Sequence, residues 1–244
     1  MPSLSAVRAS NQAWKPAFRP VVVVAGGTGG RRADFESLFL IAGIGAGVAK
    51  AFAKYGPKDA NAPYIILVGR SRQGAEDVIN EMKKHNSNGK YEFIQGDLSL
   101  MKGVRGVAAE IAGKVDEINY LCMSQGIMTM KTKDDTEEGI DRKMSLHFYS
   151  RYRIPILGLT VSFLLGNLLL PKLEKSADKG EEARVLSVLA AGKGGAIDLN
   201  DLGLKDSYGL KRKADSATTY NDLMIEVGHD SNLSDRTGVV NSTS

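Results

Sequence analysis

Short, almost purely apolar segments alternate with helix-like segments along this chain, and the alternation restricts its fold more than any other feature. Residues 21–24 and 64–68 lack polar alternation, as expected for strands that are covered on both faces. Further strands, each with its following loop, are predicted at 90–99, 118–126 and 183–195, and helices at 44–55, 74–85, 101–113, 140–173 and 215–226. This order predicts an α/β fold, a Rossmann-like doubly wound parallel sheet.

The length of 244 residues fits one α/β domain with a full core, whereas two domains would each be small. We expect a single domain at 20–226. Residues 1–19 are polar and mixed, and are interpreted as an N-terminal arm over the surface. Residues 227–244 have neither a period nor a packing face, so a disordered tail is predicted there. The C-terminal strand or strands of the sheet are then expected to be missing.

The composition excludes several classes of protein. Hydrophobic residues make up 43% and charged residues 25%, as in soluble globular proteins. The net charge of +4 is spread along the chain, so we expect no nucleic-acid partner. One cysteine, Cys122, in an apolar run, and three dispersed histidines predict a buried thiol and no metal site. No signal peptide is recognisable, so the cytoplasm is the expected compartment.

One apolar stretch, residues 154–173, raises the question of a membrane helix. Only about 17 residues separate Arg153 from Pro171, which is the lower limit for a membrane span. The stretch also contains Pro155, Gly158 and Asn167. A buried helix that carries an insertion is therefore favoured over a membrane span.

Residues 21–30 predict a dinucleotide site because a strand leads into a glycine-rich turn. Such a turn, followed by a helix, offers free backbone N–H groups and a positive dipole end to phosphate. Glycine is needed because a Cβ would block the diphosphate. Arg70 follows the second strand, where a guanidinium favours the 2′-phosphate of NADP; a plain surface arginine is the alternative. Asp97 follows the third strand and would contact adenine, cap a helix near Ser99, or do both.

Several motifs together resemble the short-chain dehydrogenase/reductase superfamily, and more narrowly fungal NAD(P)-binding proteins. They are "VAGGTGG…IGAGVAKAF", "ILVGRS", "QGDLSL", "CMSQGIM", "TEEGIDRKMSLHFYSR", "VLSVLAAGKGG" and "TTYNDLM". The resemblance implies NADP as cofactor, with NAD as the alternative, and a small carbonyl or alcohol as substrate. It also implies a homodimer. The implied cofactor-binding residues are Gly26, Thr28, Gly29, Gly30, Ile44, Gly45, Arg70, Asp97, Leu98, Ser124 and Gly126.

Compared with the superfamily, the chain carries two apparent inserts, near 31–43 and 153–166, and a different C-terminal segment after residue 226. Joining Gly30 to Ile44 restores the nucleotide motif, with Gly26, Gly30 and Gly45 as its glycines; Gly43 serves equally well in place of Gly30. Retained introns or a mis-assembled gene model would explain these departures. A genuine lid or adaptor insert is the alternative.

The resemblance also implies the catalytic residues Tyr220 and Ser187. A tyrosine exchanges a proton with the substrate oxygen, and a lysine four residues later lowers its pKa, but Met224 stands in the lysine position. Ser187 lies within the fifth strand, where an ordinary buried serine is the alternative, and the family pattern puts the hydroxyl nearer Ala190. Leu146 stands in place of the usual asparagine.

We therefore expect an NAD(P)-dependent oxidoreductase with atypical catalytic residues. Two other hypotheses compete with it. One is a non-catalytic NAD(P)-binding module, which the missing lysine favours. The other is a non-functional splice or gene-model product, which the apparent inserts and the different C-terminal segment favour.

Overall fold

A computed structural model describes residues 2–28, 43–127, 131, 134–151, 164–189, 193–204, 209–230 and 238–241, with side chains up to residue 223. Within these residues one parallel sheet has the strand order β3-β2-β1-β4-β5-β6. The strands are β1 (Val21–Ala25), β2 (Tyr64–Gly69), β3 (Lys90–Gln95), β4 (Tyr120–Met123), β5 (Arg184–Ser187) and β6 (Gly238–Asn241). The predicted α/β fold is confirmed. The strand order reverses between β1 and β4, which is where doubly wound sheets bind ligands.

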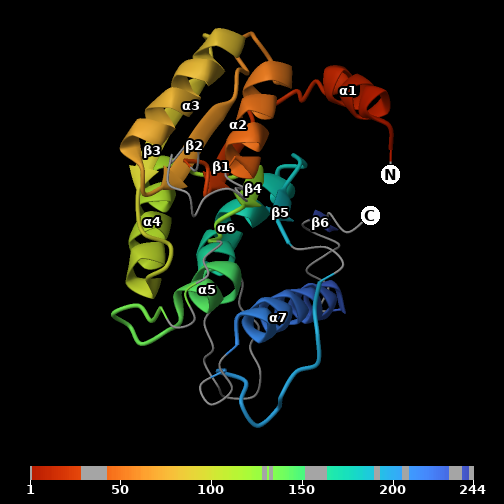
Figure 1. Cartoon of the computed structure of the whole chain (residues 1–244). Coiled ribbons are helices and arrows are strands. Elements are labelled where there is room, and N and C mark those ends of the chain that lie inside the picture. Colours follow the sequence, from red (N-terminus) through yellow and green to blue (C-terminus); the bar gives the residue numbers. More distant parts are fainter. Residues whose placement is uncertain are drawn as a thin grey trace.

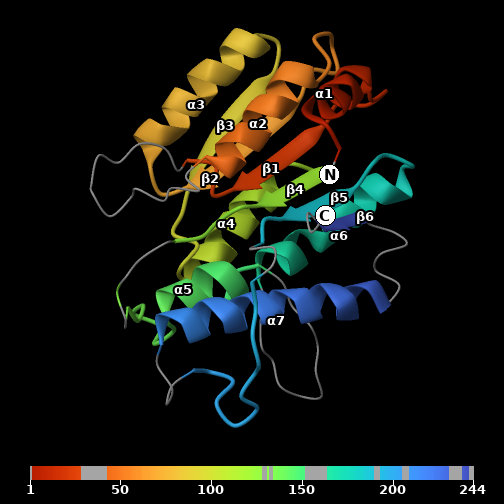
Figure 2. The ribbon, with the colours of Figure 1, turned by 45° about the vertical axis from the view of Figure 1, so that its right-hand side comes forward.

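Helices cover both faces of the sheet (Figures 1 and 2). Val22 and Val24 pack in one core cluster with α2 (Ile44–Tyr55) and α3 (Arg72–His85). Val21 and Val23 pack in the other, with α4 (Met101–Lys114) and α6 (Leu165–Asp178). All of β1 is buried, because both of its faces are covered. This explains the run of valines without polar alternation.

The strand registers place the predicted site segments along one edge of the sheet. Ala25, the last residue of β1, pairs with Val68 of β2 and Met123 of β4. Met123 in turn pairs with Ser187 of β5. The residues that follow these strands therefore lie at the same carboxyl edge.

Cys122 lies in β4 with its side chain buried, as predicted. It belongs to the cluster under α2 and α3. Burial raises the pKa of its thiol to about 12. This thiol is therefore fully protonated in the folded protein at neutral pH.

The helix predicted at 140–173 is interrupted. It begins with α5 (Arg142–Met144) and a π-helical segment, η2 (Ser145–Tyr149), and resumes as α6. Leu165 donates its N–H to the carbonyl of Ser150 at 3.2 Å, and Gly166 donates to the carbonyl of Arg151 at 3.0 Å.

In an α-helix these carbonyls would accept from residues 154 and 155. Both observed donors lie eleven residues further along the chain, so the helical hydrogen-bond pattern continues with an excess of eleven residues. The insert predicted near 153–166 falls at this point. The last residues of that range belong to the following helix: Leu164 is the N-cap of α6, and Leu165 and Gly166 lie in it. Residues 152–163 lie outside the described residues.

In the described part of the chain, no helix combines the length and the apolar character that crossing a membrane requires. Residues 154–163, half of the apolar stretch that raised the question, fall outside that part.

The N-terminal segment contains a helix, α1 (Leu4–Ala13), that has no buried residue and extends beside the body of the molecule (Figure 1). Trp14 joins this segment to the domain. Its ring makes edge contacts with Phe52 and Tyr120, with centroids 5.5 and 5.8 Å apart.

The C-terminal segment differs from the predicted disordered tail at 227–244. The last helix, α7 (Leu210–Asp230), begins five residues before the predicted start and continues past residue 226. Gly238–Asn241 then forms β6, which pairs in parallel with β5. β6 has four residues, and its two consecutive valines are too few for a recognisable strand pattern. Its pairing with β5 is a long-range contact, which periodicity does not encode.

Candidate functional site

The turn after β1 requires glycine at its first position. Gly26 has a φ of +88°, a left-handed conformation that favours glycine, and donates its N–H to the carbonyl of Val68 at 3.0 Å. A Cβ at Gly26 would lie 2.7 Å from the amide nitrogen of Gln125. Thr28 is described and buried, whereas Gly29 and Gly30 lie outside the described residues. The end of β1 therefore packs directly against the backbone that follows β4.

The start of α2 packs against the turn after β1 and the residue that follows β4. A Cβ on Gly45 would collide with the hydroxyl of Ser124, which donates to the carbonyl of Ala25 at 2.9 Å. This is the close helix–strand packing that the last glycine of a dinucleotide motif provides. Ile44 is 39% exposed in the first turn, and no side chain among the described residues caps it. Among the described residues, the N–H groups of the first turn of α2 are therefore left for an anion.

Gly43, the alternative to Gly30, precedes α2 with a φ of +142°. A Cβ there would meet no atom within 4 Å among the described residues, so close packing does not require this glycine. Its conformation alone favours glycine. The choice between the two glycines stays open, because Gly30 is not described.

Arg70 and Asp97 follow β2 and β3 at the same edge. Arg70 is exposed, as contact with a ligand phosphate would require. Asp97 accepts the N–H of Ser99 at 2.8 Å. Its pKa is lowered overall: burial acts to raise it, but the hydrogen bonds from Ser99 and the charges of Arg70 and Arg142 outweigh burial. Asp97 is therefore an ionised acceptor within the electrostatic reach of Arg70.

Asp97 does not cap α4. The first amides of that helix, at Met101 and Lys102, donate to the carboxylate of Glu138 at 2.6 and 3.0 Å. Leu98 is buried in the core beneath this edge. The cap that was the alternative role for Asp97 is thus supplied by a residue far along the chain.

The end of β4 is closed by a histidine that sequence reasoning missed. A Cβ at Gly126 would lie 2.8 Å from Cε1 of His147, so glycine is needed for this contact. Nε2 of His147 lies 3.2 Å from the amide nitrogen and 3.0 Å from the carbonyl oxygen of Ile127, and the tautomer decides whether it accepts from the first or donates to the second. Burial, followed by the charge of Arg151, lowers the pKa of His147 to about 4, so the imidazole is neutral at physiological pH.

Tyr220 lies on α7, in a small cluster that also contains Phe148, whose ring centroid is 5.0 Å from its own. Its hydroxyl donates to the carbonyl of Leu202 at 3.1 Å. Burial raises its pKa, and the nearby Tyr149 and Asp201 raise it further. This is the opposite of the shift that an activating lysine would produce. The side chain of Met224 lies outside the described residues.

The basic residues near Tyr220 in sequence have other partners. Lys213 is buried, and its Nζ lies 2.6 Å from the carboxylate of Asp141. Arg212 pairs with Asp198 at 2.8 Å and Lys211 with Asp215 at 2.6 Å. These contacts direct the three basic groups to carboxylates rather than to the phenol.

Ser187 ends β5 with its side chain buried, and its hydroxyl oxygen accepts from Arg151 at 3.1 Å. Sequence reasoning missed Arg151 as well. One signal was present: Arg151 follows Met144 by seven residues and His147 by four, which puts the three on one face of a helix. An arginine on an otherwise buried face indicates a specific interior partner.

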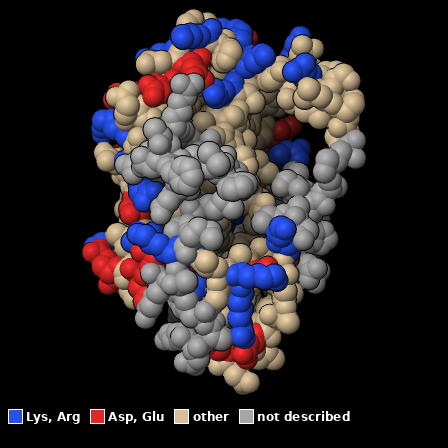
Figure 3. All heavy atoms as spheres, viewed as in Figure 1, with Lys and Arg blue, Asp and Glu red and all other residues tan. Residues whose placement is uncertain are grey.

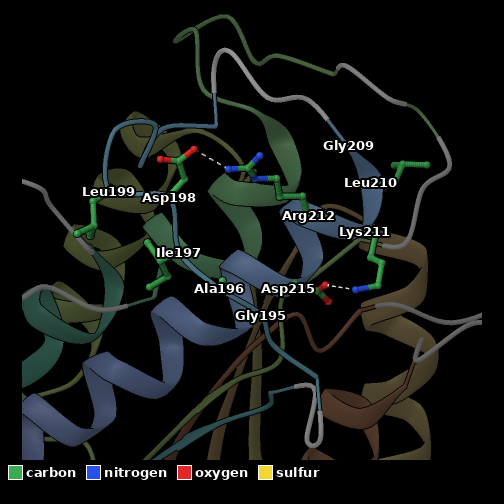
Figure 4. A pocket seen from close by; sticks show the side chains of 10 residues that line it. All are labelled: Gly195, Ala196, Ile197, Asp198, Leu199, Gly209, Leu210, Lys211, Arg212 and Asp215. Carbon is green, nitrogen blue, oxygen red and sulfur yellow. Dashed lines mark hydrogen bonds and ion pairs between the residues drawn. The ribbon is translucent and has the colours of Figure 1, made fainter.

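A pocket of about 970 Å³ opens beside the first turn of α7. It is lined by residues 195–199 and 209–212 and by Asp215. Figure 4 shows the two ion pairs of Arg212 and Lys211 at this pocket, with Ile197 and Leu199 on the facing loop. Leu199 is 81% exposed. The pocket thus combines apolar side chains with paired charges, next to the loop to which Tyr220 is hydrogen bonded.

Charges elsewhere on the surface are mixed. On the face shown in Figure 3, lysine and arginine side chains alternate with aspartate and glutamate. Among the described residues, no group of three histidine, cysteine, aspartate or glutamate side chains is arranged to hold a metal ion.

Comparison with known proteins identifies the family. The model of a family described as short chain dehydrogenase matches residues 40–155, a stretch that begins in the first predicted insert and ends in the second. Oxidoreductase AN1596 of Emericella nidulans is 28% identical over 93% of this chain and 58% of its own length. Short-chain dehydrogenase/reductase SAT2 of Stachybotrys chartarum is 32% identical over 79% of this chain and 49% of its own.

This chain therefore spans about half the length of the curated relatives it matches. Among solved structures, the RhlG/NADP active-site complex of Pseudomonas aeruginosa has a TM-score of 0.56 at 16% identity, over 92% of this chain and 71% of that one. The parallel sheet and the glycine turn after β1 agree with these similarities. The family model, the curated relatives and the solved structures together support a place for this chain in the short-chain dehydrogenase/reductase superfamily.

Proposed function

We propose that this chain is an NAD(P)-dependent oxidoreductase that interconverts a carbonyl compound and an alcohol. The observation that carries the proposal is the convergence of Gly26, Gly45 and Ser124 at the carboxyl edge of the sheet. A side chain at either glycine would collide with the backbone or with Ser124 where these segments meet. The first turn of α2 also keeps N–H groups without a side-chain cap, which suits a diphosphate.

The residues present fit a dinucleotide. Gly26, Thr28, Ile44 and Gly45 would hold the diphosphate, together with Gly29 and Gly30. Arg70 would pair with a 2′-phosphate, since an exposed guanidinium stands where NAD-dependent relatives of the fold place an acid. The RhlG complex, a structural neighbour, is described with NADP, which supports the same preference.

The remaining predicted residues complete the cofactor site. Asp97 and Leu98 would contact the adenine end, and Ser124 and Gly126 would line the end of β4. When bound, the coenzyme supplies a hydride.

Tyr220 and Ser187 are the proposed proton donor and oxygen-binding residue for the substrate. Because the pKa of Tyr220 is raised, its phenol stays protonated at neutral pH. It would therefore serve carbonyl reduction better than alcohol oxidation, which needs the phenolate as a base. Slow turnover in the reductive direction is the expected activity.

A non-catalytic NAD(P)-binding module is the second candidate. It is favoured by the hydrogen bond from Tyr220 to the carbonyl of Leu202 and by the raised pKa of the phenol. In this case the glycine turn after β1 and the start of α2 bind the coenzyme, and Tyr220 only holds the loop. A product of retained introns that does not fold is the third.

Titration of the purified chain with NADPH separates these candidates. Coenzyme fluorescence and melting temperature should both respond. If neither responds, the first two candidates are excluded. Arg70→Ser should weaken NADPH binding by about tenfold and leave NADH binding nearly unchanged. Arg72→Ser is the matched control, because that guanidinium lies over the ring of Phe93 instead. Oxidation of bound NADPH by a panel of aldehydes and ketones then distinguishes an enzyme from a binding module.

A further inference from the structure

Arg151 is a deeply buried arginine near the proposed site, with 3% of its surface exposed. It connects three segments that are distant in sequence. Nη2 donates to the carbonyl of Gln125 at 2.6 Å, Nη1 donates to the carbonyl of Val188 at 2.6 Å and to Oγ of Ser187 at 3.1 Å, and Nε donates to the carbonyl of Leu146 at 3.3 Å. The ends of β4 and β5 are thus held by one planar fork.

These bonds fix the orientation of the peptide groups at the sheet edge. In a trans peptide the N–H points away from the C=O of the same unit. Because the carbonyls of Gln125 and Val188 point toward Arg151, the N–H groups of Gly126 and Leu189 point away from it.

The same arginine sets the role of the Ser187 hydroxyl. Arginine can only donate hydrogen bonds, so the Ser187 oxygen accepts this one and its own hydrogen remains available to donate to another oxygen. The positive charge also acts on other groups at this edge. It lowers the pKa of His147 in the same direction as burial, and it lowers the pKa of Cys122 against the larger effect of burial.

We propose that Arg151 is the positioning residue for the substrate oxygen, holding Ser187 and the ends of β4 and β5 so that their donors face a carbonyl. It also places a fixed positive charge near this oxygen, which Met224, in the position of the superfamily lysine, does not supply. Donors that are oriented before the reaction stabilise negative charge as it develops on the oxygen. This inference rests on the proposed carbonyl reduction.

The test compares Arg151→Lys, which keeps the charge but loses the fork, with Arg151→Met and with Arg105→Met, an exposed arginine on α4. For Arg151→Lys we expect an NADPH dissociation constant within about threefold of the original protein. Its kcat for the best carbonyl should fall at least tenfold, with KM changed less than threefold. Arg105→Met should match the original protein. An unchanged kcat in Arg151→Lys, or a fall explained by lost NADPH binding, would overturn the proposal.

Ser187→Ala provides a second test of the shared hydrogen bond. It should lower kcat, and adding Arg151→Lys to it should cost much less than Arg151→Lys alone, because both changes remove the same hydrogen bond. Additive losses would contradict the proposal.

Hydrogen exchange separates this proposal from the proposed function. If the original protein binds NADPH but reduces no carbonyl, the catalytic function fails. Arg151→Lys should still speed exchange about tenfold in peptides covering 121–127 and 184–189, and leave β2 unchanged. Unchanged exchange at both strand ends would overturn the positioning role whatever the activity.

Discussion

Gly45 lies where α2 approaches the end of β4 so closely that a methyl group would collide with the Ser124 hydroxyl, whereas Gly47, two residues later, faces open space. The same substitution at these two positions of one helix should therefore have opposite effects. The difference in stability between the two variants separates the effect of the close contact at Gly45 from the general preference of helices for alanine.

Gly45→Ala should lower the free energy of unfolding by about 1–3 kcal/mol, because either the Ser124 hydroxyl or the helix must move. Gly47→Ala should raise it by up to about 1 kcal/mol, since alanine is the better helix former. Urea unfolding measures both. Adding Ser124→Ala to Gly45→Ala should recover part of the loss, and equal effects at the two glycines would contradict this packing.

His147 should make the stability depend on pH. Burial and Arg151 lower its pKa to about 4 in the folded protein from 6.5, so the unfolded state takes up the proton first as the pH falls. Stability is therefore fully present above pH 6.5 and is lost as the pH falls from there toward 4.

Between pH 7 and pH 5 the loss assigned to His147 is about 2 kcal/mol. His147→Gln should reduce the total loss by that amount, and His85→Gln, at an exposed position, should not. Urea unfolding at the two pH values measures it. A pH dependence identical in the original protein and His147→Gln would show that this imidazole is not buried as described.

Among the site residues, those with a motif were predictable and those without one were not. Gly26 and Gly45 were found because close backbone approach permits only glycine, and the structure shows that approach directly. Arg151 and His147 were missed because their roles depend on which helix face meets β4 and β5. Tyr220 was proposed from its motif, but its hydrogen bond to Leu202 depends on a loop whose path no local pattern encodes.

At the scale of elements, the bounds of α2 follow directly from the sequence, because its apolar spacing is regular and Gly56 ends it. The divided helix shows the limit of such reasoning. Its two parts each have helical spacing, so the sequence predicts one long helix. The carbonyls of Ser150 and Arg151 accept from residues that lie eleven positions beyond the usual helical donors. Only the three-dimensional contacts reveal this.

Removal of residues 153–163 should join η2 to α6 without changing the rotation of α6 about its axis, because it takes away the same eleven residues. We expect the free energy of unfolding to rise by about 1–2 kcal/mol, since a long connection no longer has to be closed. Thermal melting and urea unfolding measure this rise.

Removal of residues 153–162 is the matched control. One residue too many turns α6 by about 100°, which moves Leu165, Leu169 and Leu173 away from the core. This variant should be less stable than the original protein. Equal stability of the two deletions would show that the hydrogen-bond pattern does not continue across this point.

At the scale of the whole molecule, the parallel sheet was predictable because each central strand is apolar on both faces. Its final strand was not. β6 is four residues long and lies at the edge of the sheet. Its strand conformation depends on pairing with β5 and is not indicated by its own sequence. The segment after residue 226 thus completes the sheet at the position where the superfamily continues with a strand.

Truncation after Asp230 should remove β6 and expose the edge of β5. We expect the free energy of unfolding to fall by about 2 kcal/mol, from the lost backbone hydrogen bonds, and amide exchange in β5 to increase. Truncation after Asn241 keeps β6 and should change neither. No difference between the two truncations would restore the interpretation of this segment as a tail.

The reactivity of the single cysteine, Cys122, can be used to measure opening of the folded chain. Thiol reagents react with the thiolate, and at pH 8 a pKa near 12 leaves only about one Cys122 in ten thousand in that form. Modification should therefore proceed only when β4 separates from its neighbours. The labelling rate then measures how often the centre of the sheet opens, and a coenzyme that binds the folded chain should slow it.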